Sequence, residues 1–152
     1  MSTVMTWQTK SISSDATEQL AEKLGKRLRG GEVIVLASDL GGGKTTFVKG
    51  LARGFGSQDT VASPSFTISR EYESGDKIMH HFDFYRLNDP REWAEAGLRD
   101  TLTERGLRLV EWPTQAGAMR PQADLALTIE CQDHEQRWVH WQAMTEAGRR
   151  LL

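Results

Sequence analysis

The apolar residues at the start of the chain predict an amphipathic helix. Apolar side chains recur every four residues from Ala16 to Leu28, which produces one continuous apolar stripe along a helix. Residues 15–18 have the spacing of a helix capping box, and the glycine pair at 30–31 ends the pattern. We therefore expect a helix that begins at this box and packs on a sheet.

The next apolar run, at 33–37, predicts a buried strand, and a second helical pattern follows it after a glycine-rich stretch. This second helix is expected to end near Phe55, closed by Gly54 and Gly56. The side chains expected to face the core are Phe47, Val48, Leu51, Ala52 and Phe55.

The rest of the chain predicts mainly strands. Residues 68–72 and 77–84 flank a turn at 73–76, which is the pattern of an antiparallel hairpin, and a second hairpin is expected around 132–136. Residues 89–102 begin with a cap and a proline and predict another helix. The other expected strands are 6–12 as a short edge strand, 107–110, and the hairpin strands 124–131 and 137–144.

The glycine-rich stretch after the buried strand has the composition of a phosphate-binding loop. It reads Asp39-Leu40-Gly41-Gly42-Gly43-Lys44-Thr45-Thr46. Glycines allow successive backbone N–H groups to converge on a phosphate, the helix start adds a positive dipole, Lys44 adds a charge, and Thr45 offers Mg²⁺ an oxygen. The strict motif G-x-x-x-x-G-K-[ST] has Ser38 in place of its first glycine, but the order of strand, loop and helix is the required one.

These elements together predict an α/β protein. We expect a P-loop NTPase-like three-layer fold with a mixed central sheet, helices on both faces and antiparallel hairpins. The chain has 152 residues, a length that predicts a single domain spanning 1–152.

Two carboxylates stand out: Asp83 ends the run 78–82, and Glu111 ends the run 107–110. Ligands of open α/β sheets bind beyond the carboxyl ends of the strands, so both acids are expected beside the glycine loop. There they could hold Mg²⁺ together with Thr45 and position an attacking water. Thr67 lies in a hydroxyl-rich segment and is expected to sense the γ-phosphate or the metal. The predicted catalytic residues are therefore Lys44, Thr67, Asp83 and Glu111.

His80 and His81 are neighbours on a predicted strand, so their side chains point to opposite faces of the sheet and do not suit one shared metal. We expect packing or surface roles for both histidines.

Composition narrows the class of protein. Nineteen basic and twenty-one acidic residues give a formal charge of −2, which does not suggest a general polyanion-binding surface. The single cysteine, Cys131, excludes an internal disulfide and a multi-cysteine metal site, and we expect it to serve packing. No apolar run approaches the length of a membrane span, and the N-terminus has no signal-like segment. We expect a soluble, cytoplasmic protein.

A phosphate-binding loop also has uses other than ATP hydrolysis. A small-molecule kinase would use the loop to phosphorylate an acceptor, but the sequence after the central helix predicts a hairpin rather than an arginine-bearing lid. A GTPase is disfavoured because the N-K-x-D signature is missing: the only asparagine, Asn88, is followed by Asp89 and Pro90. A regulator that binds nucleotide without turnover is a further alternative if Ser38 disables hydrolysis.

Four ordered stretches carry a resemblance to a known family. They are 39–46, Ser63-Pro64-Ser65-Phe66-Thr67, the run 81–90 from His81-Phe82-Asp83 to Asp89-Pro90, and Glu111-Trp112-Pro113. Together they resemble the TsaE family, also called YjeE, of small bacterial P-loop ATPases in tRNA threonylcarbamoyladenosine biosynthesis. The family pattern differs at four small positions, with glycine at Ser38, alanine at Gly42, threonine at Ser65 and tyrosine at Phe66.

The resemblance implies roles for residues of all four stretches. It implies that residues 39–46 bind ATP or ADP, that Thr45, Asp83 and Glu111 support Mg²⁺, that Thr67 belongs to a switch-like loop, and that Trp112 lies beside the nucleotide. It further implies hydrolysis of ATP to ADP and phosphate, weak in the isolated chain. The implied partners are the TsaD and TsaB proteins, with tRNA engaged indirectly through their complex.

Overall fold

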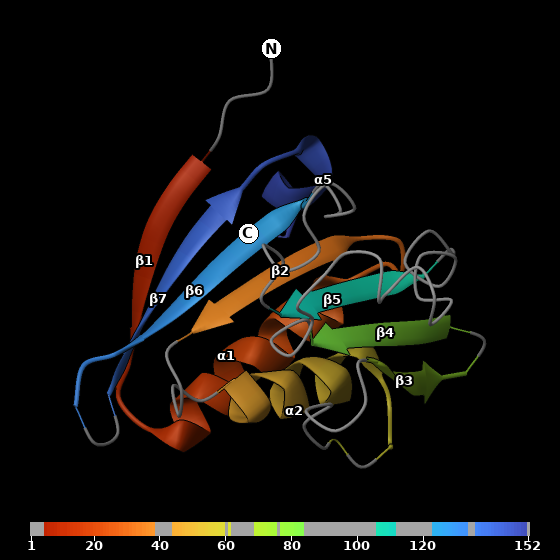
Figure 1. Cartoon of the computed structure of the whole chain (residues 1–152), viewed down its shortest axis with the longest axis horizontal. Helices are drawn as coiled ribbons and strands as arrows, with labels where there is room; N and C mark the ends of the chain where they lie inside the picture. The colour runs from red at the N-terminus through yellow and green to blue at the C-terminus, as the bar shows by residue number, and fades with distance from the viewer. Residues whose placement is uncertain are drawn as a thin grey trace.

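The computed structural model describes residues 5–38, 44–59, 61, 69–75, 77–83, 106–111, 123–133 and 136–151 (Figure 1). Its elements in chain order are β1 (Met5–Ser11), α1 (Ser14–Arg27), β2 (Val33–Ser38), α2 (Lys44–Phe55), β3 (Ser69–Ser74), β4 (Lys77–Asp83), β5 (Leu107–Glu111), β6 (Leu125–Cys131), β7 (Arg137–Ala143) and α5 (Glu146–Arg149).

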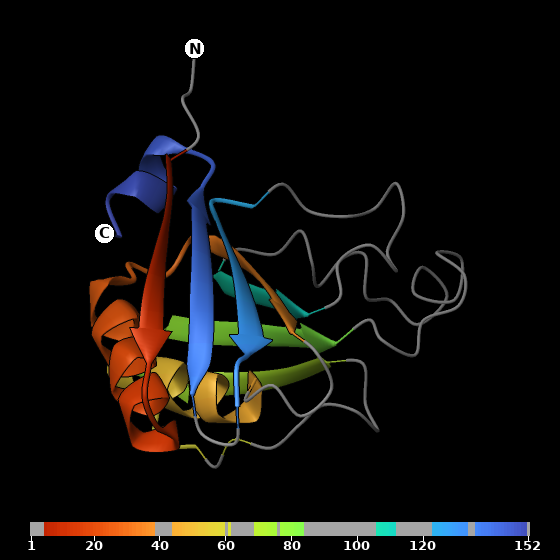
Figure 2. The same ribbon diagram turned by 90° about the vertical axis from the view of Figure 1, so that its left-hand side faces the viewer.

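The described strands form one mixed sheet with the order β1-β7-β6-β2-β5-β4-β3. The central strand β2 pairs in parallel with β5 on one side and with β6 on the other, and β4 pairs in parallel with β5. The outer pairs β3–β4, β6–β7 and β1–β7 are antiparallel. The sheet is strongly twisted, so that β1, β7 and β6 stand steeply to β3 and β4 (Figure 2). The mixed α/β architecture and both predicted hairpins are thus confirmed.

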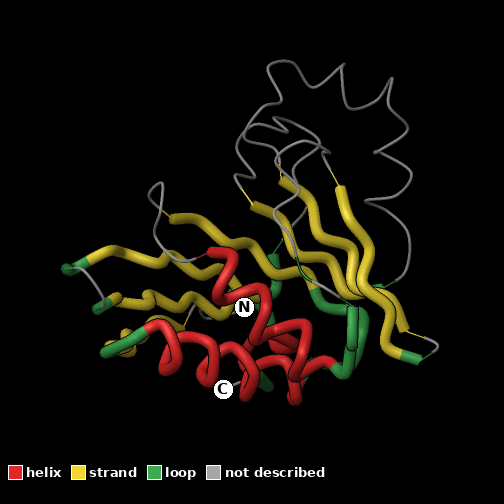
Figure 3. Tube along the Cα trace, turned by 90° about the horizontal axis from the view of Figure 1, so that it is seen from below, coloured by secondary structure: helices red, strands yellow, loops and turns green. Residues whose placement is uncertain are grey.

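The helices α1 and α2 run side by side across one face of this sheet (Figure 3). The apolar stripe of α2 packs against aliphatic residues of the central strands, and every side chain predicted to face the core from this helix is buried. Burial of this size dominates the favourable free energy of folding. The core therefore fixes α2 to the strand β2 that precedes it in the chain. The main contributors from both layers are Ile34, Leu36, Phe47, Val48, Leu51, Ala52, Phe55 and Leu109.

The two helices approach each other closely because glycines lie at their contact. A Cβ atom added at Gly50 or Gly54 of α2 would overlap with the carbonyl oxygen of Glu18 or Glu22 in α1, and one added at Gly25 would overlap with the backbone of α2. Gly54 is therefore a packing residue inside the helix, and not the helix end that the sequence predicts. Gly56 has a φ of 99° and follows the last helical residue, as predicted.

Arg53 joins the same two helices at their exposed edge. Its guanidinium lies 3.1 Å from the carboxylate of Glu18 and 3.0 Å from that of Glu22. The hydrogen bond with Glu22 is the main cause that raises the pKa of Arg53 above its ordinary value. Because the pair is solvated, its net contribution to stability is small.

Helix α1 begins earlier in the chain than the sequence predicts. Ser13 is the N-cap: its backbone is extended, and its Oγ accepts a hydrogen bond of 3.1 Å from the amide of Ala16. The helix begins at Ser14, and the box predicted at 15–18 falls inside it. A serine one residue before the helix satisfies an orphan N–H directly, which explains the earlier start.

The expectation that Cys131 serves packing is wrong. It ends β6 and is exposed, with its Sγ 3.3 Å from the carbonyl oxygen of Asp133. The alternation of β6 delivers Leu125, Leu127 and Ile129 to the core, and Cys131 lies past the edge of that core. The short helix α5, capped by Thr145, was not predicted.

Some predicted elements lie outside the described residues. These are the loop at 63–67 and the helix at 89–102, so a helical layer on the second face of the sheet stays a prediction. Within the described ranges, no helix is long and apolar enough to cross a membrane.

Candidate functional site

The strands β2, β4 and β5 are parallel neighbours, so their carboxyl ends meet at the same edge of the sheet, as their arrowheads show in Figure 1. The glycine loop at 39–43 lies outside the described residues, but both of its anchors are described. β2 ends at Ser38 immediately before the loop, and α2 begins at Lys44 immediately after it. The strand and the helix that the sequence predicts on either side of the glycine-rich stretch are therefore both present.

The first turn of α2 is suited to an anion. It contains no acidic residue, and it presents Lys44, Thr45 and Thr46 in sequence. Thr45 is exposed, and the other two side chains are half-buried. The first N–H groups of a helix carry partial positive charge, which a phosphate can neutralise. The buried residues Phe47 and Val48 follow at once and hold this turn against the sheet.

Glu111 is a buried carboxylate at the same edge. It is the last residue of β5, only 4% exposed, and its Cα atom pairs with Leu36 of β2 on one side and with Asp83 of β4 on the other. Leu36 lies two residues before the end of β2, or about 7 Å along the strand. The structure thus brings Glu111 and the backbone of Asp83 together beside the strand that leads into the glycine loop. The side chain of Asp83 is outside the described atoms.

A buried histidine accompanies Glu111. The Nε2 atom of His81 lies 3.3 Å from Oε2 of Glu111, and the His81 side chain is 3% exposed. Next to it on β4, His80 points to the other face, where its Nδ1 lies 3.5 Å from Oε1 of Glu71. The predicted opposite orientation is confirmed. The contact of His81 with a candidate site residue was missed, since it depends on β4 and β5 being neighbours.

Oxygen donors of the kind that Mg²⁺ prefers are present at this edge. The hydroxyl of Thr45 stands at the exposed start of α2, and the carboxylate of Glu111 is buried at the end of the adjacent strand. Magnesium sites typically use one or two such protein ligands and complete the shell with waters and substrate phosphates. The described donor set therefore fits this metal in its chemistry. No group of three or more His, Cys, Asp and Glu side chains suited to a metal occurs within the described parts of the chain.

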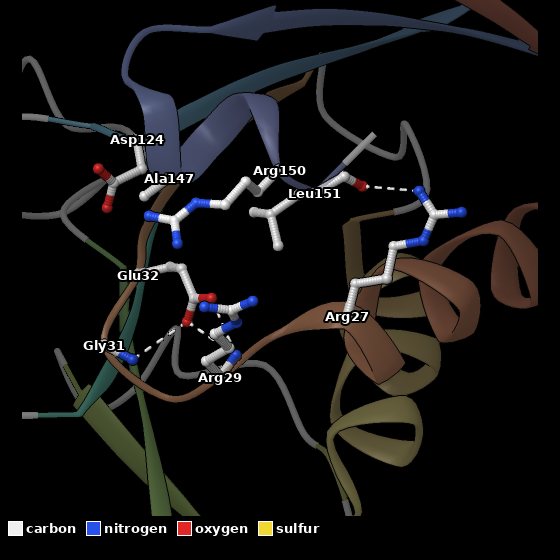
Figure 4. Close-up of a pocket in the computed structure, with 8 residues that line it drawn as sticks. All are labelled: Arg27, Arg29, Gly31, Glu32, Asp124, Ala147, Arg150 and Leu151. Carbon is white, nitrogen blue, oxygen red and sulfur yellow. Dashed lines mark hydrogen bonds between the residues drawn. The ribbon is translucent and has the colours of Figure 1, made fainter.

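A separate pocket of about 450 Å³ lies at the opposite, amino end of β2 (Figure 4). Arg27, Arg29 and Arg150 line it together with Glu32 and Asp124. Its carboxylates already serve the fold. Glu32 accepts hydrogen bonds of 2.8 to 3.0 Å from three successive backbone amides at 29–31, and Asp124 accepts one of 2.9 Å from the amide at 33. This pocket is distinct from the edge where the glycine loop is anchored.

Comparison with known proteins agrees with this geometry. The family model described as "Threonylcarbamoyl adenosine biosynthesis protein TsaE" matches residues 11–139. The chain belongs to the TsaE family.

Curated members of the TsaE family match along most of the chain. The "tRNA threonylcarbamoyladenosine biosynthesis protein TsaE" of Bacillus subtilis is 35% identical over 138 residues, which cover 91% of this chain and 85% of that protein. The protein of the same name from Aquifex aeolicus is 37% identical over 129 residues, covering 84% and 89%. That of Haemophilus influenzae is 36% identical over 120 residues, covering 79% and 75%.

A solved structure shares the fold. It is titled "Crystal structure of Bacillus subtilus YdiB", and it superposes with a TM-score of 0.81 at 28% identity, covering 99% of this chain and 94% of that one. The resemblance seen in the sequence and the family are thus confirmed, and so is the α/β fold class.

The TsaE motifs are only partly described in the structure. The structure describes the backbone of three parts of these motifs: residues 44–46, residues 81–83 and Glu111. The predicted nucleotide-binding residues Asp39, Leu40, Gly41, Gly42 and Gly43, the switch residue Thr67 and the aromatic Trp112 lie outside the described residues, so their roles stay predictions.

Proposed function

We propose that this chain is a magnesium-dependent ATPase that supports the biosynthesis of threonylcarbamoyladenosine in tRNA. The observation that carries the proposal is the buried carboxylate of Glu111, which lies on the strand beside β2 at the edge where the glycine loop is anchored. Membership in the TsaE family and the names of its curated relatives support the tRNA role.

Each described residue at the edge has a role in this proposal. Lys44 contributes a positive charge to the β- and γ-phosphates of ATP, and the first N–H groups of α2 contribute the helix dipole. The hydroxyl of Thr45 and the carboxylates of Glu111 and Asp83 would hold Mg²⁺. The metal, when bound, neutralises charge that develops on the phosphate oxygens. Glu111 also orients the attacking water, and burial keeps its carboxylate in one place for that task.

The predicted residues outside the described ranges complete the proposal. Asp39 to Gly43 supply backbone N–H groups to the phosphates, Thr67 responds to the γ-phosphate, and Trp112 lies against the nucleotide. We propose TsaB and TsaD as partners and an indirect contact with tRNA through them. Because phosphoryl transfer depends on positioning, completion of the site by a partner would raise a slow intrinsic rate.

Replacement of Lys44 by alanine tests the phosphate site. We expect Lys44→Ala to lower ATP turnover about a hundredfold, the size of effect typical for the loss of one charged or hydrogen-bonding contact to the transition state. The matched control is Lys49→Ala, an exposed lysine on the same helix, which removes the same charge away from the first turn. Phosphate release should be measured with and without Mg²⁺. Equal turnover in the two variants would contradict the proposed site.

A second assay separates the proposed ATPase from its alternatives. Phosphate release from ATP and from GTP is measured with the chain alone and with TsaB, TsaD and tRNA added. We expect Mg²⁺-dependent release from ATP that rises with the partners. Transfer of phosphate to a metabolite without partners would identify a kinase, and nucleotide binding with no release under any condition would identify a regulator.

A further inference from the structure

His81 forms a buried polar pair with the candidate residue Glu111. The imidazole is 3% exposed and the carboxylate 5%, and their facing atoms, Nε2 and Oε2, are 3.3 Å apart. Neither ring nitrogen of His81 has a hydrogen-bond partner of good geometry among the described residues. Burying polar groups without a partner is costly. The ring nitrogens of His80 also lack such a partner, but the carboxylate beside His80 is exposed, whereas the carboxylate beside His81 is buried.

The strand register explains how the two side chains meet. β4 and β5 are parallel, with His81 paired to Leu109 and Asp83 paired to Glu111. His81 and Glu111 are thus diagonal neighbours on one face of the sheet. This is also the face on which Leu109 packs with the core residues of α1 and α2. On the opposite side of His81, the ring of Tyr72 from β3 lies 6.1 Å away between centroids. The imidazole is held between a buried aromatic ring and the carboxylate.

The chemistry of this pair favours one protonation arrangement. A neutral imidazole has one N–H donor and one bare nitrogen, while an ionised carboxylate is an acceptor only. A bare Nε2 atom would place a lone pair against Oε2 of Glu111, which is repulsive. An Nε2–H group would instead donate to that oxygen after a small rotation of either group. The separation of 3.3 Å is just beyond the usual N–H···O range, which ends at about 3.2 Å, so a small movement would complete the bond.

We propose that His81 is a positioning residue for Glu111. Its Nε2–H group donates to Oε2, fixes the orientation of the carboxylate, and leaves Oε1 for the metal or the attacking water. The inference rests on the proposed function, in which Glu111 serves the Mg²⁺-nucleotide complex. His81 itself touches neither substrate nor metal.

Three variants with a built-in control test this role. His81→Leu removes the donor, His81→Gln restores an amide donor near the position of Nε2, and His80→Leu makes the same change at the neighbouring buried histidine on the other face. The readouts are urea denaturation and the ratio of ADP affinities with and without Mg²⁺. We expect His81→Leu to lower this ratio about tenfold, with His81→Gln intermediate and His80→Leu within about twofold of wild type. Metal-free ADP affinity should stay unchanged in all three.

A double-mutant cycle with Glu111→Ala, which removes the acceptor, asks whether His81 acts through the carboxylate. If it does, His81→Leu changes the Mg²⁺ effect by less than about twofold once Glu111 has been replaced, because the two effects are not additive for coupled residues. Equal losses in both backgrounds would overturn the inference. So would equal losses for His81→Leu and His80→Leu, since these would indicate a structural role alone.

The tautomer of His81 is measured separately from any activity. Long-range ¹H–¹⁵N spectra of the wild-type protein distinguish the two ring nitrogens, and we expect the proton on Nε2. A proton on Nδ1 alone would overturn the inference even if ATP is hydrolysed. Conversely, an Nε2–H group in a protein that neither binds nor hydrolyses ATP would leave the pairing intact and refute the proposed function.

Discussion

At the scale of single residues, Glu111 is the most informative side chain of the candidate site. A carboxylate whose side chain is 5% exposed loses most of its hydration, and within the described residues a polar group that faces it is the imidazole of His81. Buried charged pairs are often no more stabilising than apolar residues of the same shape. A buried carboxylate at a strand end therefore indicates a functional role rather than a contribution to stability.

Replacing Glu111 by glutamine tests that view. Glu111→Gln keeps the shape and an acceptor for His81 but removes the charge, so we expect ATP turnover to fall about a hundredfold, within the range for a lost acid–base or orienting group. The free energy of unfolding should change by no more than about 1 kcal/mol, because the amide can still accept a hydrogen bond. Turnover is measured by phosphate release and stability by urea denaturation.

The control for Glu111→Gln is Glu71→Gln. Glu71 also lies beside a buried histidine, His80, but its side chain is 55% exposed and the contact is on the other face of the sheet. We expect this variant to keep wild-type turnover. A comparable loss in both variants would show that the effect comes from charge removal in general and not from the site.

Some of these site residues could be predicted from the sequence, and others could not. Asp83 and Glu111 could be placed because each ends an apolar strand, and strand ends gather at one edge of an α/β sheet. The strand alternation also gave the opposite directions of His80 and His81. Their burial could not be predicted, because it depends on which strands lie beside β4. The partner of His81 is far away in sequence and is supplied by the parallel register with β5.

At the scale of elements, the contact between α1 and α2 depends on glycine. Gly50 and Gly54 lie inside α2, where glycine is intrinsically less favourable than alanine by about 1 kcal/mol. The missing side chains let the backbone of α1 approach, and the closeness of that contact outweighs the unfavourable helix propensity.

Gly50→Ala tests whether the close helix contact outweighs the unfavourable helix propensity of glycine. In an exposed helix the change would stabilise, but here the new Cβ would overlap with the carbonyl oxygen of Glu18, so we expect a loss of about 2 kcal/mol from overpacking. The control is Gly31→Ala, whose Cβ would meet nothing within 4 Å, and which should change stability by less than about 1 kcal/mol. Urea denaturation of both variants gives the comparison. A stabilised Gly50→Ala protein would contradict the close contact.

The predicted helices and strands are confirmed where the local sequence pattern determines the structure. Alternation around two turns gave both hairpins, and the apolar spacing of α2 gave its buried face. The errors came from tertiary contacts. The local pattern predicts a helix end at Gly54, but its contact with α1 places it inside the helix. The pattern also predicts that Cys131 packs in the core, but the core along β6 ends before this residue.

At the scale of the whole molecule, the edge strand β1 contributes stability from outside the strands that carry the candidate site. The edge strand β1 is separated from β2 by β7 and β6. It is held by the stacked rings of Trp7 and Trp141, with centroids 5.6 Å apart, and by a 3.1 Å hydrogen bond from the Trp141 indole to Thr9. These groups do not belong to β2, β4 or β5, although the ring of Trp141 also packs edge-on against Phe47 of α2, with centroids 6.5 Å apart.

Trp7→Ala should therefore destabilise the protein without changing the site. We expect a loss of about 2 kcal/mol in the free energy of unfolding, since a half-buried aromatic ring and its stacking partner are separated. ADP affinity, measured by calorimetry well below the melting temperature, should stay within about twofold of wild type. Gln8→Ala, at the neighbouring exposed position of β1, is the control and should change neither quantity. A selective loss of ADP affinity in Trp7→Ala would show that the edge strand and the site are coupled.

The glycine contact between α1 and α2 also limits how the sequence can diverge. Any side chain at positions 25, 50 or 54 would push the two helices apart, and α2 carries Lys44 and Thr45 on its first turn. A substitution at one of these glycines is therefore tolerated only with compensating changes across the helix pair. The apolar positions of the same helices can exchange one aliphatic residue for another at little cost. Over evolutionary time, the slowest-changing positions of this helix pair should be those that have no side chain at all.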